Sequence, residues 1–167
     1  VCRPVGAPSA MYHRNGPRMK ISAAILGCSG PRLHPDERRF FTQANPWGFI
    51  LFARNVENPD QLARLTADLR DAVGRDAPIL IDQEGGRVAR MRAPHWQEWL
   101  PPLDLVTKLD PDAQTRAIST RYRVIAAELR DVGIDVNCAP TLDIATPQTH
   151  PFLRNRCLGE NAAQVAR

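Results

Sequence analysis

The sequence predicts an α/β fold in which about four βα units build a parallel sheet. Short apolar runs of strand length alternate with amphipathic helical stretches, and no hairpin signal joins neighbouring runs. Polar residues follow the second, third and fourth runs, and this pattern is typical of the carboxyl-end site of a (β/α)8 barrel. A whole barrel needs about 200 to 250 residues, so 167 residues have room for half of one. An open doubly wound sheet is the alternative.

The composition is that of a globular chain with no special partner. Apolar residues make up 43%, and the net charge is +4 from 22 Lys+Arg against 18 Asp+Glu. Almost all the basic residues are arginines scattered among acids, whereas a nucleic-acid site gathers them on one face. No apolar run is long enough for a membrane span. We therefore expect neither a nucleic-acid partner nor a membrane.

The cysteines indicate a reducing compartment. Cys2, Cys28, Cys138 and Cys157 include no C-x-x-C pair and no histidine at metal spacing. Sparse, unpatterned thiols without a secretory signal favour the cytoplasm. No metal site and no cofactor are expected.

The first 18 residues are predicted to be a disordered extension. They hold three prolines, two glycines and no apolar period. Met19 is a candidate for the true first residue, and residues 19–167 are predicted to form a truncated barrel domain. The apolar stretch 21–28 is short and leads into Gly30-Pro31, so it reads as a first strand and not as a signal peptide.

The next stretch holds two helices around a second strand. Pro35 opens a short helix that runs towards Gln43, and the second strand covers residues 48–52. Asn58 caps a longer helix that Gly74 ends. Its apolar stripe consists of Leu62, Leu65, Leu69 and Val73.

The third and fourth strands enclose the longest helix. Residues 78–82 form an apolar run that suits a strand buried on both faces. A long connection, 87–109, leads to a helix over 112–133, whose stripe is Ile118, Tyr122, Ile125 and Leu129. A fourth strand follows at 134–139, then a loop over 141–159 and the beginning of a helix at Glu160. Because that last helix has no stop signal, we expect the chain to be the first part of a longer one.

Asp82 and Glu84 stand two residues apart where the third strand ends. Paired carboxylates serve glycoside hydrolysis, in which one protonates the leaving oxygen and the other attacks or activates water. The spacing alone favours a simpler role for Glu84, which is to accept backbone N–H bonds in the turn. Gly85 and Gly86 permit positive φ and a close backbone approach.

Other polar side chains near the predicted strand ends are candidates for contacts with a ligand. Arg87 and Arg90 could present guanidinium groups, and of Arg154 and Arg156 one could face the site while the other is exposed. Asn137 and Asp143 could bind a ligand or only brace the loop. The two tryptophans of the long connection, Trp96 and Trp99, could stack on a sugar, although packing under the loop is the commoner role.

Other active-site patterns are missing. The four histidines, His13, His34, His95 and His150, show no metal or triad spacing. The sequence also contains no G-x-S-x-G nucleophile elbow and no Gly-rich phosphate turn.

Four segments in order resemble one family. They are 48–55 (GFILFARN), 81–90 (IDQEGGRVAR), 133–143 (GIDVNCAPTLD) and 155–159 (NRCLG). Together they resemble bacterial β-N-acetylhexosaminidases of glycoside hydrolase family 3, of the cytoplasmic cell-wall-recycling type. The resemblance implies a (β/α)8 barrel that removes terminal non-reducing β-linked N-acetylglucosamine from muropeptides with retention.

By matching position, the resemblance implies that Asp82, Arg90 and Arg156 bind the sugar. Asp82 is then neither nucleophile nor acid/base. Cys157-Leu158 departs from the family, in which a serine and an aromatic residue are common. The full-length protein is expected to be a monomer.

The family's catalytic residues lie further along its sequence than any segment matched here. A K-H-F-P-G-H-G stretch, a His–Asp dyad and an aspartate nucleophile are absent from this chain. We therefore assign no catalytic residue and expect the chain alone to be inactive. The alternative is a non-catalytic sugar- or partner-binding half-barrel that keeps Asp82, Arg90 and Arg156 and dimerises.

Overall fold

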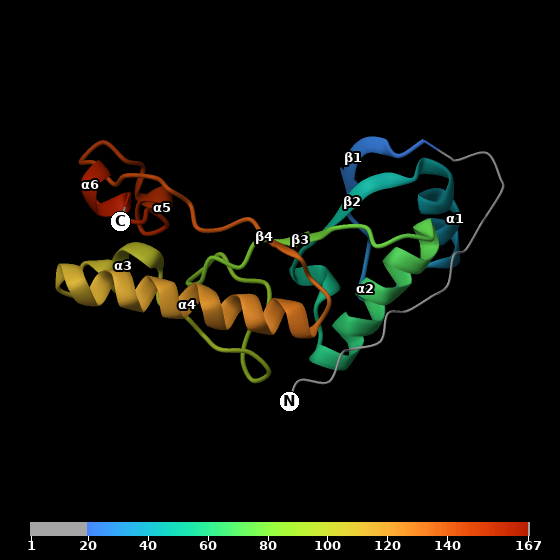
Figure 1. Cartoon of the computed structure of the whole chain (residues 1–167), viewed down its shortest axis with the longest axis horizontal. Coiled ribbons are helices and arrows are strands. Elements are labelled where there is room, and N and C mark those ends of the chain that lie inside the picture. Colours follow the sequence, from blue (N-terminus) through green and yellow to red (C-terminus); the bar gives the residue numbers. More distant parts are fainter. Residues whose placement is uncertain (1–19, 167) are drawn as a thin grey trace, which may run out of the picture.

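A computed structural model describes residues 20–166 as a four-stranded sheet whose longer helices lie along one side (Figure 1). The predicted extension over residues 1–18 lies outside the described part. The elements in chain order are β1 (Ser22–Leu26), α1 (Pro35–Ala44), β2 (Pro46–Leu51), η1 (Ala53–Asn55), α2 (Pro59–Val73), β3 (Ile79–Ile81), α3 (Pro102–Val106), α4 (Pro111–Asp131), β4 (Val136–Asn137), α5 (Pro151–Arg154) and α6 (Ala162–Val165).

The sheet has the strand order of a barrel. Its order is β1-β2-β3-β4, and every neighbouring pair is parallel. In a doubly wound sheet the strand order reverses at a switch point. The order of the four described strands simply follows the chain and does not reverse. The half-barrel prediction is therefore confirmed over the doubly wound alternative.

The core lies between the sheet and the helices that connect its strands. From β2, Phe49 packs edge-on against Phe41 of α1, with ring centroids 5.1 Å apart. The leucine stripe predicted for α2 is fully buried at Leu62, Leu65 and Leu69. Ile125 and Leu129 of α4 join the same core. The periodicity of these helices thus correctly identified the faces that cover the sheet.

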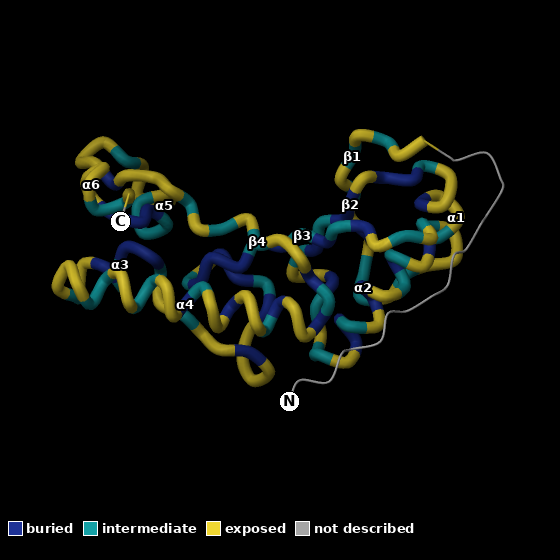
Figure 2. Tube along the Cα trace, viewed as in Figure 1, coloured by how far each residue is buried: buried dark blue, intermediate teal, exposed yellow. Residues whose placement is uncertain are grey.

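The opposite face of the sheet is open, which corrects the prediction of strands buried on both faces. Ile50, Leu80 and Val136 are paired in register and point away from the helices. Ile50 and Leu80 are only half-buried, Val136 is 37% exposed, and Ile25 of β1 is 44% exposed. This face would be the interior of a closed barrel. Figure 2 shows buried stretches along β2 and β3.

Most helix ends follow the predicted signals. The Asn58 side chain accepts a hydrogen bond from the Gln61 backbone N–H at 3.0 Å, and Gly74 ends α2 with a φ of 63°. The long connection differs from the prediction because it contains α3. The fourth strand is also shorter than predicted, with two residues in place of six. Among the described residues, no helix is long and apolar enough to cross a membrane.

Candidate functional site

The candidate site lies at the carboxyl ends of β3 and β4. In a parallel sheet these ends share one edge, where the loops that follow the strands meet. The Asn137 side chain accepts a hydrogen bond from the Gln83 N–H at 3.0 Å and donates one to the Gln83 carbonyl at 2.9 Å. This reciprocal pair fixes the edge where the two strands end.

A tight loop brings Arg90 back to Asp82. Gly85 and Gly86 both have positive φ, 99° and 60°, and the backbone N–H groups of Glu84 and Gly85 donate to the Val88 carbonyl. The Arg90 Nη2 then lies 2.8 Å from the Asp82 Oδ2. The two side chains are 24% and 27% exposed, so both are open to a ligand at the edge.

The buried Gln83 side chain holds this loop closed. Its Oε1 accepts hydrogen bonds from the backbone N–H groups of Arg90 and Met91, at 2.8 and 3.1 Å. Its Nε2 donates to the Met91 carbonyl at 2.8 Å. One amide thus satisfies three backbone groups, of which the two of Met91 are buried and need a partner within the protein.

Glu84 binds Arg156, and neither sequence interpretation of this carboxylate is right. Arg156 donates from Nε to Oε2 at 2.9 Å and from Nη2 to Oε1 at 2.6 Å. Glu84 therefore does not cap the turn, and with its side chain 3% exposed it is not open to a substrate. The hydrogen bonds from Arg156 to Glu84 raise the pKa of the guanidinium, as do the charges of Glu84, Asp143 and Asp82.

Arg121 of α4 lies beneath the loop, and the sequence interpretation missed it. It is 1% exposed, and its Nη2 donates to the Glu84 carbonyl. No residue between 20 and 166 accepts a hydrogen bond from its Nε or Nη1. Burial lowers its pKa, and the charges of Tyr122 and Glu84 act in the opposite direction. A signal did exist, because Arg121 lies three residues after Ile118 and four before Ile125, on the apolar stripe.

Cys138 stands beside Asp82. Its backbone N–H donates to the Ile81 carbonyl at 2.8 Å, which places it directly after the end of β4. Burial raises the pKa of its thiol, and so does the neighbouring Asp82 carboxylate. The exposed thiol is therefore neutral near pH 7 and is a weak nucleophile.

Arg87 and Arg154 are engaged outside the site. The Arg87 guanidinium lies 3.6 Å from the centroid of the Phe152 ring and donates to the Phe152 carbonyl. Arg154 pairs with Glu160 at 2.7 Å on the surface. Of the two arginines in the 141–159 loop, Arg156 is therefore the one that faces the strand ends, and Arg154 is the exposed one.

The two tryptophans of the long connection and two of the described histidines have structural roles. Trp96 is part of the core, and Trp99 packs against it, so the packing interpretation is the correct one. His34 is the N-cap residue of α1, where its backbone N–H donates to the Glu37 Oε2 at 3.1 Å. His150 caps α5, and its Nδ1 accepts from the Phe152 N–H at 3.1 Å. Within residues 20–166, no group of three or more His, Cys, Asp or Glu side chains could hold a metal ion.

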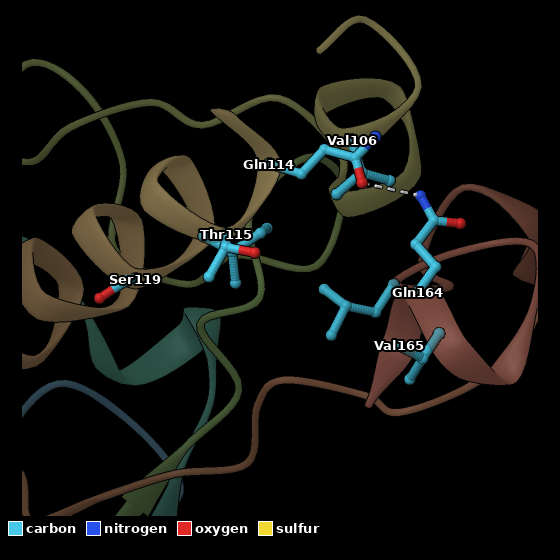
Figure 3. A pocket seen from close by; sticks show the side chains of 8 residues that line it. Val106, Gln114, Thr115, Ser119, Gln164 and Val165 are labelled. Atoms are coloured by element: carbon cyan, nitrogen blue, oxygen red, sulfur yellow. Dashed lines mark hydrogen bonds between the residues drawn. The ribbon is translucent and has the colours of Figure 1, made fainter. Parts of the chain in front are cut away.

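Two cavities border α4. One of about 360 Å³ separates α3 and α4 from the segment 158–165 (Figure 3), where the Gln164 Nε2 donates to the Gln114 Oε1 at 3.2 Å. Another, of about 570 Å³, lies between α4 and residues 98–109. Their linings are mainly apolar. Ligand sites of parallel barrels lie at the carboxyl ends of the strands, so we place the site at the paired charges there.

Comparisons with known proteins give a consistent result. Residues 19–167 match the family described as glycosyl hydrolase family 3 N terminal domain. The β-hexosaminidase of Methylococcus capsulatus is 41% identical over 115 residues, which are 69% of this chain and 34% of that protein. The β-hexosaminidase of Stenotrophomonas maltophilia (strain K279a) is 34% identical over 146 residues, which are 85% of this chain and 42% of that protein.

Solved structures agree with the sequence relatives. Native NagZ from Neisseria gonorrhoeae superposes with a TM-score of 0.77 at 29% identity, over 87% of this chain and 43% of that chain. It has also been solved in complex with N-trifluoroacetyl-D-glucosamine. A family 3 β-N-acetylglucosaminidase from Paenibacillus sp. superposes with a TM-score of 0.72 at 32% identity, over 85% of this chain and 27% of that chain. The chain thus spans less than half the length of these relatives.

Proposed function

The chain belongs to the glycosyl hydrolase family 3 N-terminal domain family, and on that premise we propose that it is the sugar-holding half of a β-N-acetylhexosaminidase. The whole protein would remove terminal non-reducing β-linked N-acetylglucosamine from muropeptides with retention of configuration. Relatives named β-hexosaminidase and a neighbour solved with an N-acylated glucosamine support this substrate class. A cytoplasmic, monomeric enzyme of peptidoglycan recycling is part of the same proposal.

The observation that carries the proposal is the pairing of charges at the strand ends. Asp82 and Arg90 form one partly exposed ion pair, and Arg156 projects from the neighbouring loop. Carboxylates accept and guanidinium groups donate charge-assisted hydrogen bonds, which suit the hydroxyl and amide groups of a sugar. Asp82 would accept from hydroxyl groups, while Arg90 and Arg156 would donate to the oxygens of the N-acetylglucosamine.

The chain alone is proposed to bind sugar without cleaving it. The family's nucleophile and His–Asp dyad belong to segments that this sequence does not contain. Retaining hydrolysis needs both a nucleophile and an acid/base group, and Asp82 is assigned to neither role. The 167-residue chain is therefore expected to show no turnover of a chromogenic β-N-acetylglucosaminide. Measurable turnover by the purified chain would refute this.

Binding is tested by titrating the ¹⁵N-labelled chain with N-acetylglucosamine, and with glucose as the control that lacks the amide. We expect saturable shifts around the strand ends, with a Kd on the order of millimolar for half a site. Asp82→Asn, Arg90→Gln and Arg156→Gln should each weaken binding about tenfold. Arg154→Gln, in the same loop as Arg156, should leave it unchanged. Equal affinities in all four variants would refute the assignment.

A further inference from the structure

We propose that Glu84 is a positioning residue that orients Arg156 towards the sugar. The inference rests on the proposed function, because it assigns Glu84 a role only through the arginine that would contact the ligand. Glu84 itself is too deeply buried to reach a ligand at the edge. Neither sequence interpretation of this carboxylate included such a role.

The contact between the two side chains is made at two points. The Nε and Nη2 atoms lie on one edge of the Arg156 guanidinium, and each donates to a different oxygen of Glu84, at 2.9 and 2.6 Å. Two parallel bonds fix both the position and the plane of a guanidinium group, whereas one bond would leave it free to rotate. The remaining nitrogen, Nη1, is not engaged by Glu84.

The two side chains of the pair differ in burial. The Glu84 side chain is 3% exposed, and that of Arg156 is 29% exposed. The carboxylate is therefore part of the protein interior, while the guanidinium extends from it towards the edge where Asp82 lies. A buried side chain with few accessible rotamers can hold a partly exposed one in a single orientation.

Glu84 is in turn anchored from below. Its backbone N–H donates to the Val88 carbonyl at 2.9 Å, and its carbonyl accepts from Arg121 of α4. The Arg121 guanidinium lies 5.8 Å from the Trp99 ring centroid and 5.7 Å from that of Tyr122. Arg121 of α4 thus supports the loop backbone at Glu84, and the Glu84 side chain in turn orients Arg156.

The inference is tested first without sugar, through the Nε–H signal of Arg156 in the ¹⁵N spectrum of the full 167-residue chain. In the native chain the proton is bonded to a buried carboxylate, so we expect slow exchange with water. In Glu84→Gln the two-point contact is lost and exchange should accelerate. Glu160→Gln is the matched control, since it removes the exposed partner of Arg154 in the same region. Unchanged exchange in Glu84→Gln would overturn the proposal.

A double-variant cycle tests the link to sugar binding. Glu84→Gln should weaken N-acetylglucosamine binding about tenfold in the native background, and not at all when combined with Arg156→Gln. An equal loss in both backgrounds would overturn the proposal, because Glu84 would then act independently of Arg156. If the native chain binds no sugar, the proposed function fails, and the exchange measurement still decides whether Glu84 orients Arg156.

Arg156→Lys covers the case in which Glu84→Gln does not fold. Lysine keeps the charge but cannot make two parallel bonds to a carboxylate. If orientation matters, Arg156→Lys should lose binding as Arg156→Gln does. Native affinity in Arg156→Lys would show that charge alone is sufficient and would overturn the proposal.

Discussion

Gly85→Ala is expected to destabilise the chain through two effects that can be separated. The backbone at Gly85 has a φ of 99°, which a residue with a Cβ rarely adopts. A Cβ there would also overlap the Arg121 guanidinium and would lie 2.9 Å from the Trp99 Cβ. Arg121 is fully buried, and a shift of its guanidinium would break its hydrogen bond to the Glu84 carbonyl.

Gly74 supplies the matched control. It also has a positive φ, 63°, but no atom lies within 4 Å of the position that its Cβ would occupy. Gly74→Ala should therefore cost only the left-handed backbone penalty, about 1 to 2 kcal/mol. Gly85→Ala adds an overpacking penalty of about 1 to 3 kcal/mol, so its total loss should be about 2 to 5 kcal/mol.

The assay is urea denaturation followed by circular dichroism, with the free energy of unfolding extrapolated to water. A double variant, Gly85→Ala with Arg121→Leu, removes the overlapping guanidinium and should lose less stability than the sum of the single variants. The reasoning is refuted if Gly85→Ala costs no more than Gly74→Ala, or if the two losses at Gly85 and Arg121 simply add.

Two further predictions concern thiols. Because burial and the Asp82 carboxylate raise the pKa of Cys138, Asp82→Asn should lower it and speed alkylation at pH 8. Peptide mass spectrometry measures the rate at Cys138 alone, Asp143→Asn is the control, and an unchanged rate in Asp82→Asn would contradict the contact. Burial raises the pKa of Cys28 from 9.0 to about 11, so the unfolded chain loses this proton first as pH rises. About 2 kcal/mol of stability, fully present below pH 9, should be lost between pH 9 and 11. Urea denaturation at several pH values between 9 and 11 should show a smaller loss of unfolding free energy in Cys28→Ala than in the native chain. Equal losses in the two chains would contradict the prediction.

The elements that could be predicted from the sequence are those with local causes. Asn58 and Gly74 define α2 because a side-chain cap and a left-handed glycine act within one turn of the helix. The short helix α3 was missed within a long connection whose prolines suggested an irregular path. One of them, Pro102, is in fact its first residue, a position that proline favours.

Burial of the strands could not be judged from their composition. The run 78–82 looks the same whether its second face is covered by helices or by other strands. Ile79 and Ile81 are buried under helices, and Leu80 is only half-buried on the open face. The second face depends on residues far away in the chain, which a periodicity of two does not specify.

The sequence by itself determined the order of the elements, the helix faces that cover the sheet, and the polar edge that contains Asp82 and Arg90. These follow from caps, stripes and the direction of parallel strands, all of which depend on near neighbours in the chain. Only the tertiary structure decided the roles of Glu84 and Arg121. Glu84 binds an arginine 72 positions away, and Arg121 reaches a carbonyl 37 positions away. No local sequence pattern relates residues at such separations. Only the packing of the loops and of α4 brings them into contact.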